Sequence, residues 1–193
     1  MLIRKDPIQP DDQSRTALDT QVLIIGGGVT GTGLVRDLAL RGIDCILVEK
    51  QDLNAGASGG NHGLLHSGAR YIASDPAAAA ECHLENLLLK KLAPHCIENT
   101  GGLFVAVAGD DEAYIAVFPQ MCSACGIPAR PLTPTEAREM EPALSDRLIA
   151  AYAVDDAAID PFKLSLDNMA AALQNGSHLL RFSQVVGFET HAG

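Results

Sequence analysis

The stretch from Val22 to Gly31, VLIIGGGVTG, constrains the fold of this chain more than any other feature. Its four leading apolar residues, three of them β-branched, are typical of a short strand buried on both faces of a parallel sheet. This run leads directly into a glycine turn and then into an amphipathic segment, Val29 to Arg41, which predicts a helix. The order strand, glycine turn and helix predicts the opening of a βαβ unit.

The three glycines at 26, 28 and 31 have the G-x-G-x-x-G spacing. Gly26 permits the tight turn, Gly28 lets the backbone approach a pyrophosphate, and Gly31 lets the helix pack close to the strand. The pyrophosphate would lie on the unpaired N–H groups at the start of the helix, near Val29 and Thr30. The turn therefore predicts a dinucleotide site, with a purely structural βαβ unit as the alternative.

The residues that follow the helix support a nucleotide site. Gly42 is placed to end the helix, and Cys45 to Val48 then predict a second buried strand. Glu49 follows that strand, 18 residues beyond Gly31, where an acid can accept hydrogen bonds from ribose hydroxyls. An acid at this position suits a free ribose 2′-hydroxyl, so NAD or FAD is expected rather than NADP.

Composition excludes several classes of function. The 193 residues suffice for one domain or slightly more, and the net charge of −10 without a basic stripe argues against nucleic acid as a partner. The sequence contains no run of eighteen consecutive apolar residues, so no membrane span is predicted. Residues 1–19 lack the apolar core of a signal peptide and are expected to be a flexible tail, so a cytoplasmic location is expected.

The cysteines do not form a recognisable metal or disulfide pattern. Their odd number and irregular spacing indicate reduced thiols, and no metal site is expected. One pair has the C-x-x-C spacing, but it lies in a segment with helical character and lacks a second pair, so buried free thiols are expected rather than a redox centre. The cysteines are Cys45, Cys82, Cys96, Cys122 and Cys125.

A glycine-rich segment between Asp52 and Arg70 shows neither helical nor strand periodicity. It contains five glycines and two histidines, His62 and His66. A long loop of this kind inside a domain is usually functional, because its glycines let backbone N–H groups approach a flat ring or a phosphate. A flexible surface loop is the alternative.

The glycine turn, the pair Glu49-Lys50 and the run GASGGNHGLLHSGARY at 56–71 resemble the FAD-dependent glycerol-3-phosphate dehydrogenase family, in particular the A subunits of its anaerobic members. The resemblance extends from Thr20 to the end of the chain, through EPAL at 141–144 and DPF at 160–162. Members of that family are much longer, so the resemblance implies an N-terminal portion that is incomplete at its C-terminus.

The resemblance implies an α/β fold, a Rossmann-like FAD-binding domain of the p-hydroxybenzoate-hydroxylase or D-amino-acid-oxidase type, with part of a second α+β substrate domain. On this basis residues 20–75 and 160–193 belong to the FAD-binding elements, and residues 76–159 belong partly to the substrate domain. The residues implied to contact the cofactor are Gly26, Gly28, Val29, Thr30, Gly31, Glu49, Lys50, Ser58, Asn61, Gly63, Leu64, Leu65, His66, Val185 and Val186.

The resemblance also assigns the substrate side. Arg70 and Tyr71 match a family pair that faces the substrate phosphate, and a guanidinium fork suits phosphate oxygens. For His66 three roles stay open: orienting the flavin, acting as a base, or packing. The catalytic base is otherwise not identified, and His62 is a weaker candidate.

The activity implied is the oxidation of sn-glycerol 3-phosphate to dihydroxyacetone phosphate, with electrons passed to a quinone through other subunits of a membrane-associated complex. Peripheral attachment to the inner face of the cell membrane is therefore an alternative to a purely cytoplasmic location. Two further hypotheses stay open: an FAD-dependent dehydrogenase or oxidase of 2-hydroxy acids such as L-2-hydroxyglutarate, and a truncated, inactive nucleotide-binding module.

Periodicity and turn signals predict the remaining elements. Asp75-Pro76 begins a helix to Leu92, whose leucines at 84, 87, 88 and 92 are expected in a core. Asp155-Asp156 is expected to be a turn rather than an acid–base pair. Further helices are predicted at 112–126, 135–140 and 160–175, and further strands at 102–108, 148–154, 179–182 and 185–189.

Overall fold

The computed structural model describes residues 2–5 and 17–190 and divides into two compact units. The first unit runs up to His62 and resumes at Asp160, and the second spans Gly63–Ile159. We expected the first boundary near residue 75. The structure places it at 62/63 because Leu64 and Leu65 already pair with a strand of the second unit, at Ala158 and Ala157.

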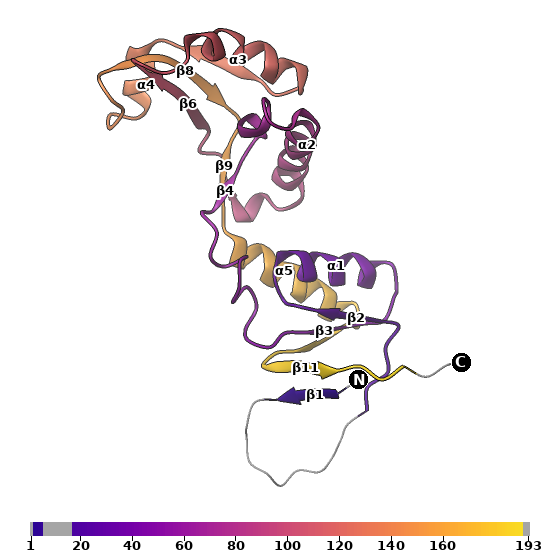
Figure 1. Cartoon of the computed structure of the whole chain (residues 1–193). Helices are drawn as coiled ribbons and strands as arrows, with labels where there is room; N and C mark the ends of the chain where they lie inside the picture. The colour runs from indigo at the N-terminus through magenta and orange to yellow at the C-terminus, as the bar shows by residue number, and fades with distance from the viewer. Residues whose placement is uncertain (1, 6–16, 191–193) are drawn as a thin grey trace. The chain divides into compact units, whose positions relative to one another are not determined.

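The first unit is a three-stranded parallel sheet with two helices beside it (Figure 1). The strand order is β10-β3-β2, and the strand predicted at 179–182 forms β10, the third parallel strand of this sheet. A two-stranded antiparallel ladder, β1 with β11, belongs to the same unit. The elements are β1 (Leu2–Lys5), β2 (Val22–Ile25), α1 (Val29–Leu40), β3 (Cys45–Val48), α5 (Pro161–Gln174), β10 (His178–Leu180) and β11 (Ser183–Gly187).

The core of the first unit lies where α1 and α5 pack side by side against the sheet (Figure 1). Val35 from α1, Met169 from α5 and Leu47 from β3 are all buried there. Every residue of β3 is buried, whereas Ile25 of β2 is 57% exposed. The expectation that β2 is buried on both faces is therefore wrong. Among the described residues β2 pairs only with β3, and the central position belongs to β3.

The N-terminal segment differs in part from the tail that we expected. Leu2–Lys5 forms β1, which pairs antiparallel with β11. The rest of the expected tail, residues 6–16, lies outside the described residues.

The second unit contains two small antiparallel sheets, β6-β8-β7 and β4-β9-β5. Its predicted strands at 102–108 and 148–154 are confirmed as the neighbours β6 and β8. The short strands β4, β5, β7 and β9 were not predicted. The elements are β4 (Leu64–Leu65), η1 (Ala69–Tyr71), α2 (Pro76–Leu92), η2 (Pro94–Cys96), β5 (Ile97–Glu98), β6 (Gly102–Val107), α3 (Glu112–Ala124), β7 (Ala129–Leu132), α4 (Pro134–Met140), β8 (Leu148–Val154) and β9 (Ala157–Ile159).

Side-chain caps explain where four of the helices begin. Asp75, Asp111 and Asp160 accept hydrogen bonds from first-turn N–H groups of α2, α3 and α5. Thr133 caps α4 in a capping box with Glu136. These caps satisfy N–H groups that have no intrahelical acceptor, which is why the sequence predicted the helix starts well.

The leucines of α2 do not lie in a core, so that expectation is wrong. Leu84, Leu87, Leu88 and Leu92 are exposed by 45–65%, and the buried residues of α2 are Ala79, His83 and Asn86. The physical reason lies in what the helix covers. Its buried face contacts loop backbone through Ala79 and Asn86, and Ala79 also packs in the apolar cluster that contains Phe118 and Cys122. Close approach requires a small residue, and the amide satisfies carbonyl groups.

Candidate functional site

The glycine turn between β2 and α1 has the geometry that its spacing predicts. Gly26 adopts φ +110°, and its N–H donates to the Val48 carbonyl at 2.9 Å. A Cβ at Gly31 would lie 2.0 Å from the Gly26 carbonyl oxygen, so only glycine lets the helix rest on the turn. Gly28 is the N-cap of α1, has no capping side chain, and is followed by a first turn without an acidic residue.

Ser58 brings the glycine-rich loop back to the start of α1. Its Oγ accepts a hydrogen bond from the Val29 N–H at 2.9 Å. A Cβ on Gly28 would lie 2.8 Å from the same Oγ, so the loop and the turn are in close contact. Asn61, also predicted as a cofactor neighbour, donates from Nδ2 to the Ser58 carbonyl. Two predicted cofactor residues of the loop are thus placed at or near the helix terminus.

Glu49 is held beside the same turn. Its Oε2 accepts from the Gly27 N–H at 2.7 Å and its Oε1 from the Gln51 N–H at 2.8 Å. Each carboxylate oxygen keeps a further lone pair for a hydroxyl donor. The Glu49 carbonyl also accepts from the Ser183 N–H at 2.9 Å, which places the start of β11 beside Glu49. Val185 and Val186 follow further along the same strand.

These groups fit a dinucleotide with a free ribose 2′-hydroxyl. The start of α1 offers backbone N–H groups and the positive end of the helix dipole, with no acidic side chain to compete with a diphosphate. A fixed carboxylate suits ribose hydroxyls and disfavours the extra phosphate of NADP. The cradle at Gly28 and Gly31 exists only because both positions lack a Cβ.

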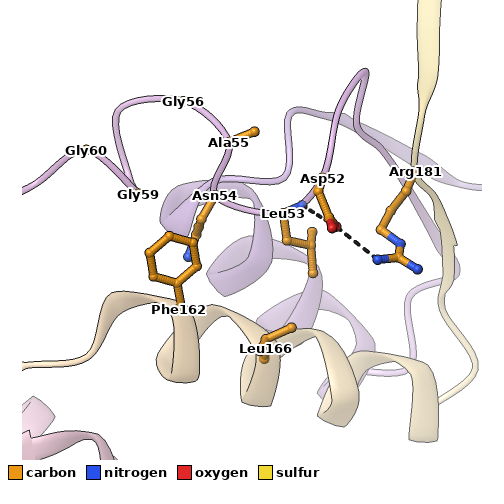
Figure 2. Close-up of a pocket in the computed structure, with 10 residues that line it drawn as sticks. All are labelled: Asp52, Leu53, Asn54, Ala55, Gly56, Gly59, Gly60, Phe162, Leu166 and Arg181. Carbon is orange, nitrogen blue, oxygen red and sulfur yellow. Dashed lines mark hydrogen bonds and ion pairs between the residues drawn. The ribbon is translucent and has the colours of Figure 1, made fainter.

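A separate groove of about 650 Å³ lies between the 52–60 loop and α5. Figure 2 shows Phe162 and Leu166 rising from α5 below this loop, with Asp52 joined to Arg181 at one side. The ion pair measures 2.9 Å and, together with the Leu53 N–H, holds the pKa of Asp52 below its ordinary value. None of the residues predicted to contact the cofactor lines this groove.

Asn54 fixes that loop to α5, a role that the sequence did not reveal. It is 3% exposed and adopts a left-handed backbone, φ +60°. Its Nδ2 donates to the Pro161 carbonyl at 2.9 Å, and its Oδ1 accepts from the Ser165 hydroxyl at 2.9 Å. Asparagine tolerates this conformation better than most residues, which is the one signal that could have indicated it.

The predicted substrate residues lie together in the second unit. His66 and Tyr71 meet edge to face with ring centroids 5.4 Å apart, and the Arg70 guanidinium carbon lies 5.4 Å from the centre of the Tyr71 ring. Arg70 is exposed, whereas Tyr71 is half-buried. Three more predicted cofactor neighbours belong to this unit: Gly63, Leu64 and Leu65.

None of the five cysteines forms a disulfide, and four of them are buried. Burial, with the neighbouring thiol of Cys125, raises the pKa of Cys122 to about 11, so its thiol stays protonated near neutral pH. The pair Cys122 and Cys125 has the properties of structural thiols rather than of a reactive centre. No helix in the described part of the chain is both long and apolar enough to cross a bilayer.

Curated proteins match this chain in sequence over nearly its whole length. The chain is 46% identical over 178 residues to the A subunit of the anaerobic glycerol-3-phosphate dehydrogenase of Haemophilus influenzae, an alignment that covers 92% of this chain and 32% of the relative. The chain thus spans about a third of the length of the curated relatives it matches.

Two solved structures share the fold. The L-proline dehydrogenase of P. horikoshii superposes with a TM-score of 0.76 at 26% identity and covers 88% of this chain and 46% of its own. The L-α-glycerophosphate oxidase of Mycoplasma pneumoniae, with FAD bound, gives 0.73 at 26% identity and covers 86% of this chain and 46% of its own.

The family assignment rests on residues 21–193, which begin just before β2 and include the glycine turn, Glu49 and the glycine-rich loop. These residues match the family described as FAD dependent oxidoreductase. The predicted α/β fold of the D-amino-acid-oxidase type is thereby confirmed, and the chain belongs to the FAD-dependent oxidoreductase family.

Proposed function

We propose that this chain binds FAD through its first unit and takes part in the oxidation of glycerol 3-phosphate. The observation that carries the first half of this proposal is the glycine turn with Glu49 fixed beside it. The diphosphate would lie on the N–H groups that open α1, near Gly28, Val29 and Thr30. Glu49 would accept hydrogen bonds from the adenosine ribose, with Lys50, Val185 and Val186 as further neighbours.

The Ser58 hydroxyl can form hydrogen bonds both without a diphosphate and with a diphosphate bound. It accepts from the Val29 N–H and still has its own proton to donate to a phosphate oxygen. A bound diphosphate would therefore gain a donor from the loop as well as from the helix. Asn61 supports this arrangement by binding the Ser58 carbonyl.

The reaction that we propose is the oxidation of the secondary alcohol of glycerol 3-phosphate to dihydroxyacetone phosphate. When bound, FAD supplies the hydride acceptor. Arg70 would hold the substrate phosphate through its planar fork of N–H donors, and Tyr71, which packs against that guanidinium, would limit its motion. The 46% identity to a protein with that activity in its name supports the choice of substrate.

His66 lies at the edge of the Tyr71 ring, so a role in orienting Tyr71 is compatible with its geometry. A role for His66 as the base that takes the hydroxyl proton, or as a flavin neighbour, belongs to the same proposal.

The path of the electrons is also part of the proposal. The relative is named as one subunit of its enzyme, so we propose that electrons leave toward a quinone through partner subunits. A location on the inner face of the cell membrane would follow from such partners.

The cofactor proposal is tested by purifying the chain with added FAD and recording the visible spectrum and the flavin fluorescence. We expect bound, oxidised flavin with a changed fluorescence. Glu49→Gln should weaken FAD about tenfold or more, because a ribose hydroxyl loses a charged acceptor. Glu85→Gln, on the exposed surface of α2, is the matched control and should leave the affinity unchanged. Binding of NAD without FAD would refute the proposal.

The substrate proposal is tested by reduction of the bound flavin with glycerol 3-phosphate and, separately, with L-2-hydroxyglutarate. We expect bleaching with glycerol 3-phosphate only. Arg70→Gln should raise the substrate concentration needed for half-maximal bleaching by about 10- to 100-fold, because a charge-assisted hydrogen bond contributes about 1.5–3 kcal/mol. Bleaching by the hydroxy acid alone would favour the second hypothesis, and flavin that neither compound reduces would favour the inactive module.

A further inference from the structure

The backbone that carries His66, Arg70 and Tyr71 is fastened by buried polar side chains that are distant in sequence. We propose that Asp156 is a positioning residue, whose carboxylate fixes Ser67 and through it the path of residues 66–71. This inference rests on the proposed function, because it assigns Asp156 to the substrate side of that site. Sequence patterns had suggested only a turn at Asp155-Asp156.

Asp156 has one dominant contact. It is 6% exposed, and its Oδ1 accepts a hydrogen bond from the Ser67 N–H at 2.6 Å. A Cβ added at Gly102 would lie 2.7 Å from the other carboxylate oxygen, so the start of β6 lies against this group and leaves it no room to swing away. A buried oxygen that is the acceptor of a loop amide is a strong constraint, because removing it would leave a buried N–H without a partner.

Helix α2 fastens the same loop from a second direction. Asn86 is fully buried, and its Nδ2 donates to the Leu65 carbonyl at 3.0 Å and to the Asp155 carbonyl at 3.2 Å. Lys90 donates to the Asp155 carbonyl at 2.9 Å and to its carboxylate at 2.8 Å. One amide therefore joins the loop to the two-residue link between β8 and β9 that contains Asp156, and Lys90 anchors that link to α2. This link is not the turn that we expected at Asp155-Asp156, because the chain runs directly from one strand into the next.

The position of Ser67 fixes that of Arg70 and Tyr71, because the backbone between them is held by a close contact and by hydrogen bonds. Gly68 adopts φ +93°, and a Cβ there would lie 2.2 Å from the Ala79 carbonyl oxygen of α2. The Tyr71 N–H then donates to the Gly68 carbonyl at 2.9 Å, and the Tyr71 carbonyl accepts from the Asp75 N–H at 2.8 Å. The 3-10 turn that presents Arg70 is thus held at both ends.

Asp156 is suited to hold this backbone and not to exchange a proton with a substrate. Its carboxylate is closed in by β6 and by the loop, and the group that donates to Oδ1 is a backbone N–H. We expect its effect on substrate binding to run entirely through the position of Arg70 and Tyr71. A displacement of about 1 Å at such a distance from the chemistry can cost about 100-fold in rate.

The test compares three variants of the chain with FAD bound. Asp156→Ala removes the acceptor, whereas Asp156→Asn keeps an oxygen at the same place without the charge. Asp110→Ala is the matched control, because Asp110 also accepts a backbone hydrogen bond in the second unit, from Val107 at 2.8 Å, in the turn after β6. Amide hydrogen exchange of residues 66–71 and the reduction of flavin by glycerol 3-phosphate are measured for each.

We expect Asp156→Ala to speed exchange in residues 66–71 by about tenfold or more relative to the rest of the chain, and to raise the half-saturating glycerol 3-phosphate concentration by a similar factor. The FAD affinity should stay within about twofold, and Asp156→Asn should stay within about threefold of the wild type in both measurements. Asp110→Ala should change neither.

Equal effects of Asp156→Ala and Asp110→Ala, or an Asn variant as impaired as the Ala variant, would overturn the proposal. If Asp156→Ala does not fold, Asp156→Glu decides the question, because it keeps the charge but moves the acceptor by one methylene and should speed exchange more than Asn does. If glycerol 3-phosphate does not reduce the wild type, the proposed function fails, and the exchange measurement alone still decides the role of Asp156.

Discussion

Replacement of Gly31 by alanine tests the geometry on which the nucleotide site depends. The added Cβ would lie 2.0 Å from the Gly26 carbonyl oxygen and 3.1 Å from the Gly26 carbonyl carbon. An ordinary contact begins at 3.4 Å, so the methyl group intrudes by about 1.4 Å into backbone rather than into a side chain that could move aside. Either α1 must shift away from β2, or the Gly26–Gly28 turn must open.

The expected magnitude follows from two opposing effects. Alanine in a helix is more favourable than glycine by about 1 kcal/mol. Overpacking in a well-packed site costs about 1–3 kcal/mol and more where the backbone itself must move. Because the intrusion here is into backbone, we expect a net loss of about 2 kcal/mol in the free energy of unfolding. We expect a loss of FAD affinity of at least tenfold from the displaced N–H groups.

Gly33→Ala is the matched control on the same helix, two residues further along. Nothing lies within 4 Å of a Cβ at Gly33, so only the helix-propensity gain remains. Urea unfolding and flavin fluorescence titration measure both variants. Gly33→Ala should be as stable as the wild type or more stable, with unchanged FAD affinity. If Gly31→Ala matched it in both measurements, the close contact between α1 and the turn would not be what requires glycine.

Three further outcomes are expected. Leu47→Ala, at a fully buried position, should lower the free energy of unfolding by about 2–5 kcal/mol, whereas Leu84→Ala, at a position 65% exposed, should cost about 0.5 kcal/mol or less in the same urea titration. A thiol reagent at pH 8 should modify Cys82 first, because the other four cysteines are buried. Cys122 should be among the slowest to react, because burial raises its pKa to about 11. Peptide mass spectrometry measures the order of modification. Hydrogen bonds from the backbone N–H and the hydroxyl of Thr133 lower the pKa of Glu136. The stability that Glu136 contributes to the fold is therefore present above the ordinary glutamate pKa of about 4.3 and is lost as the pH falls below it. Glu136→Gln should therefore lower the melting temperature at pH 7 and match the wild type near pH 3.

Local signals predicted the parts of the fold whose causes are local. The run Val22–Ile25, the glycine at 42 and the aspartate caps act over a few residues, and the corresponding elements lie within two or three residues of their predicted bounds. The two-residue strand β4 and the three-residue strand β9 had no such signal. They exist because residues 64–65 and 157–159 meet in space, a contact between segments more than 90 residues apart.

The leucines of α2 also show that local sequence patterns do not determine tertiary contacts. Their helical spacing is that of an apolar stripe, and periodicity alone cannot tell which face of a helix a neighbour will cover. In the second unit the covered face carries Ala79, which packs in the apolar cluster and against loop backbone, and Asn86, which donates to loop carbonyl groups. The stripe of leucines lies on the other side and is exposed.

The sequence by itself determined that a βαβ unit with a glycine turn lies near the start of this chain and that an acid follows its second strand. Both features depend on residues that are adjacent in sequence and have fixed backbone requirements. It also carried the family resemblance that the comparison with known proteins bears out. Only the tertiary structure decided that β3 rather than β2 is fully buried, that Asn54 ties the loop to α5, and that Asp156 reaches the amide of Ser67. The burial of β3 depends on its pairing with β10, and the other two facts depend on hydrogen bonds across 89 to 111 residues. No local pattern encodes a partner at such a distance.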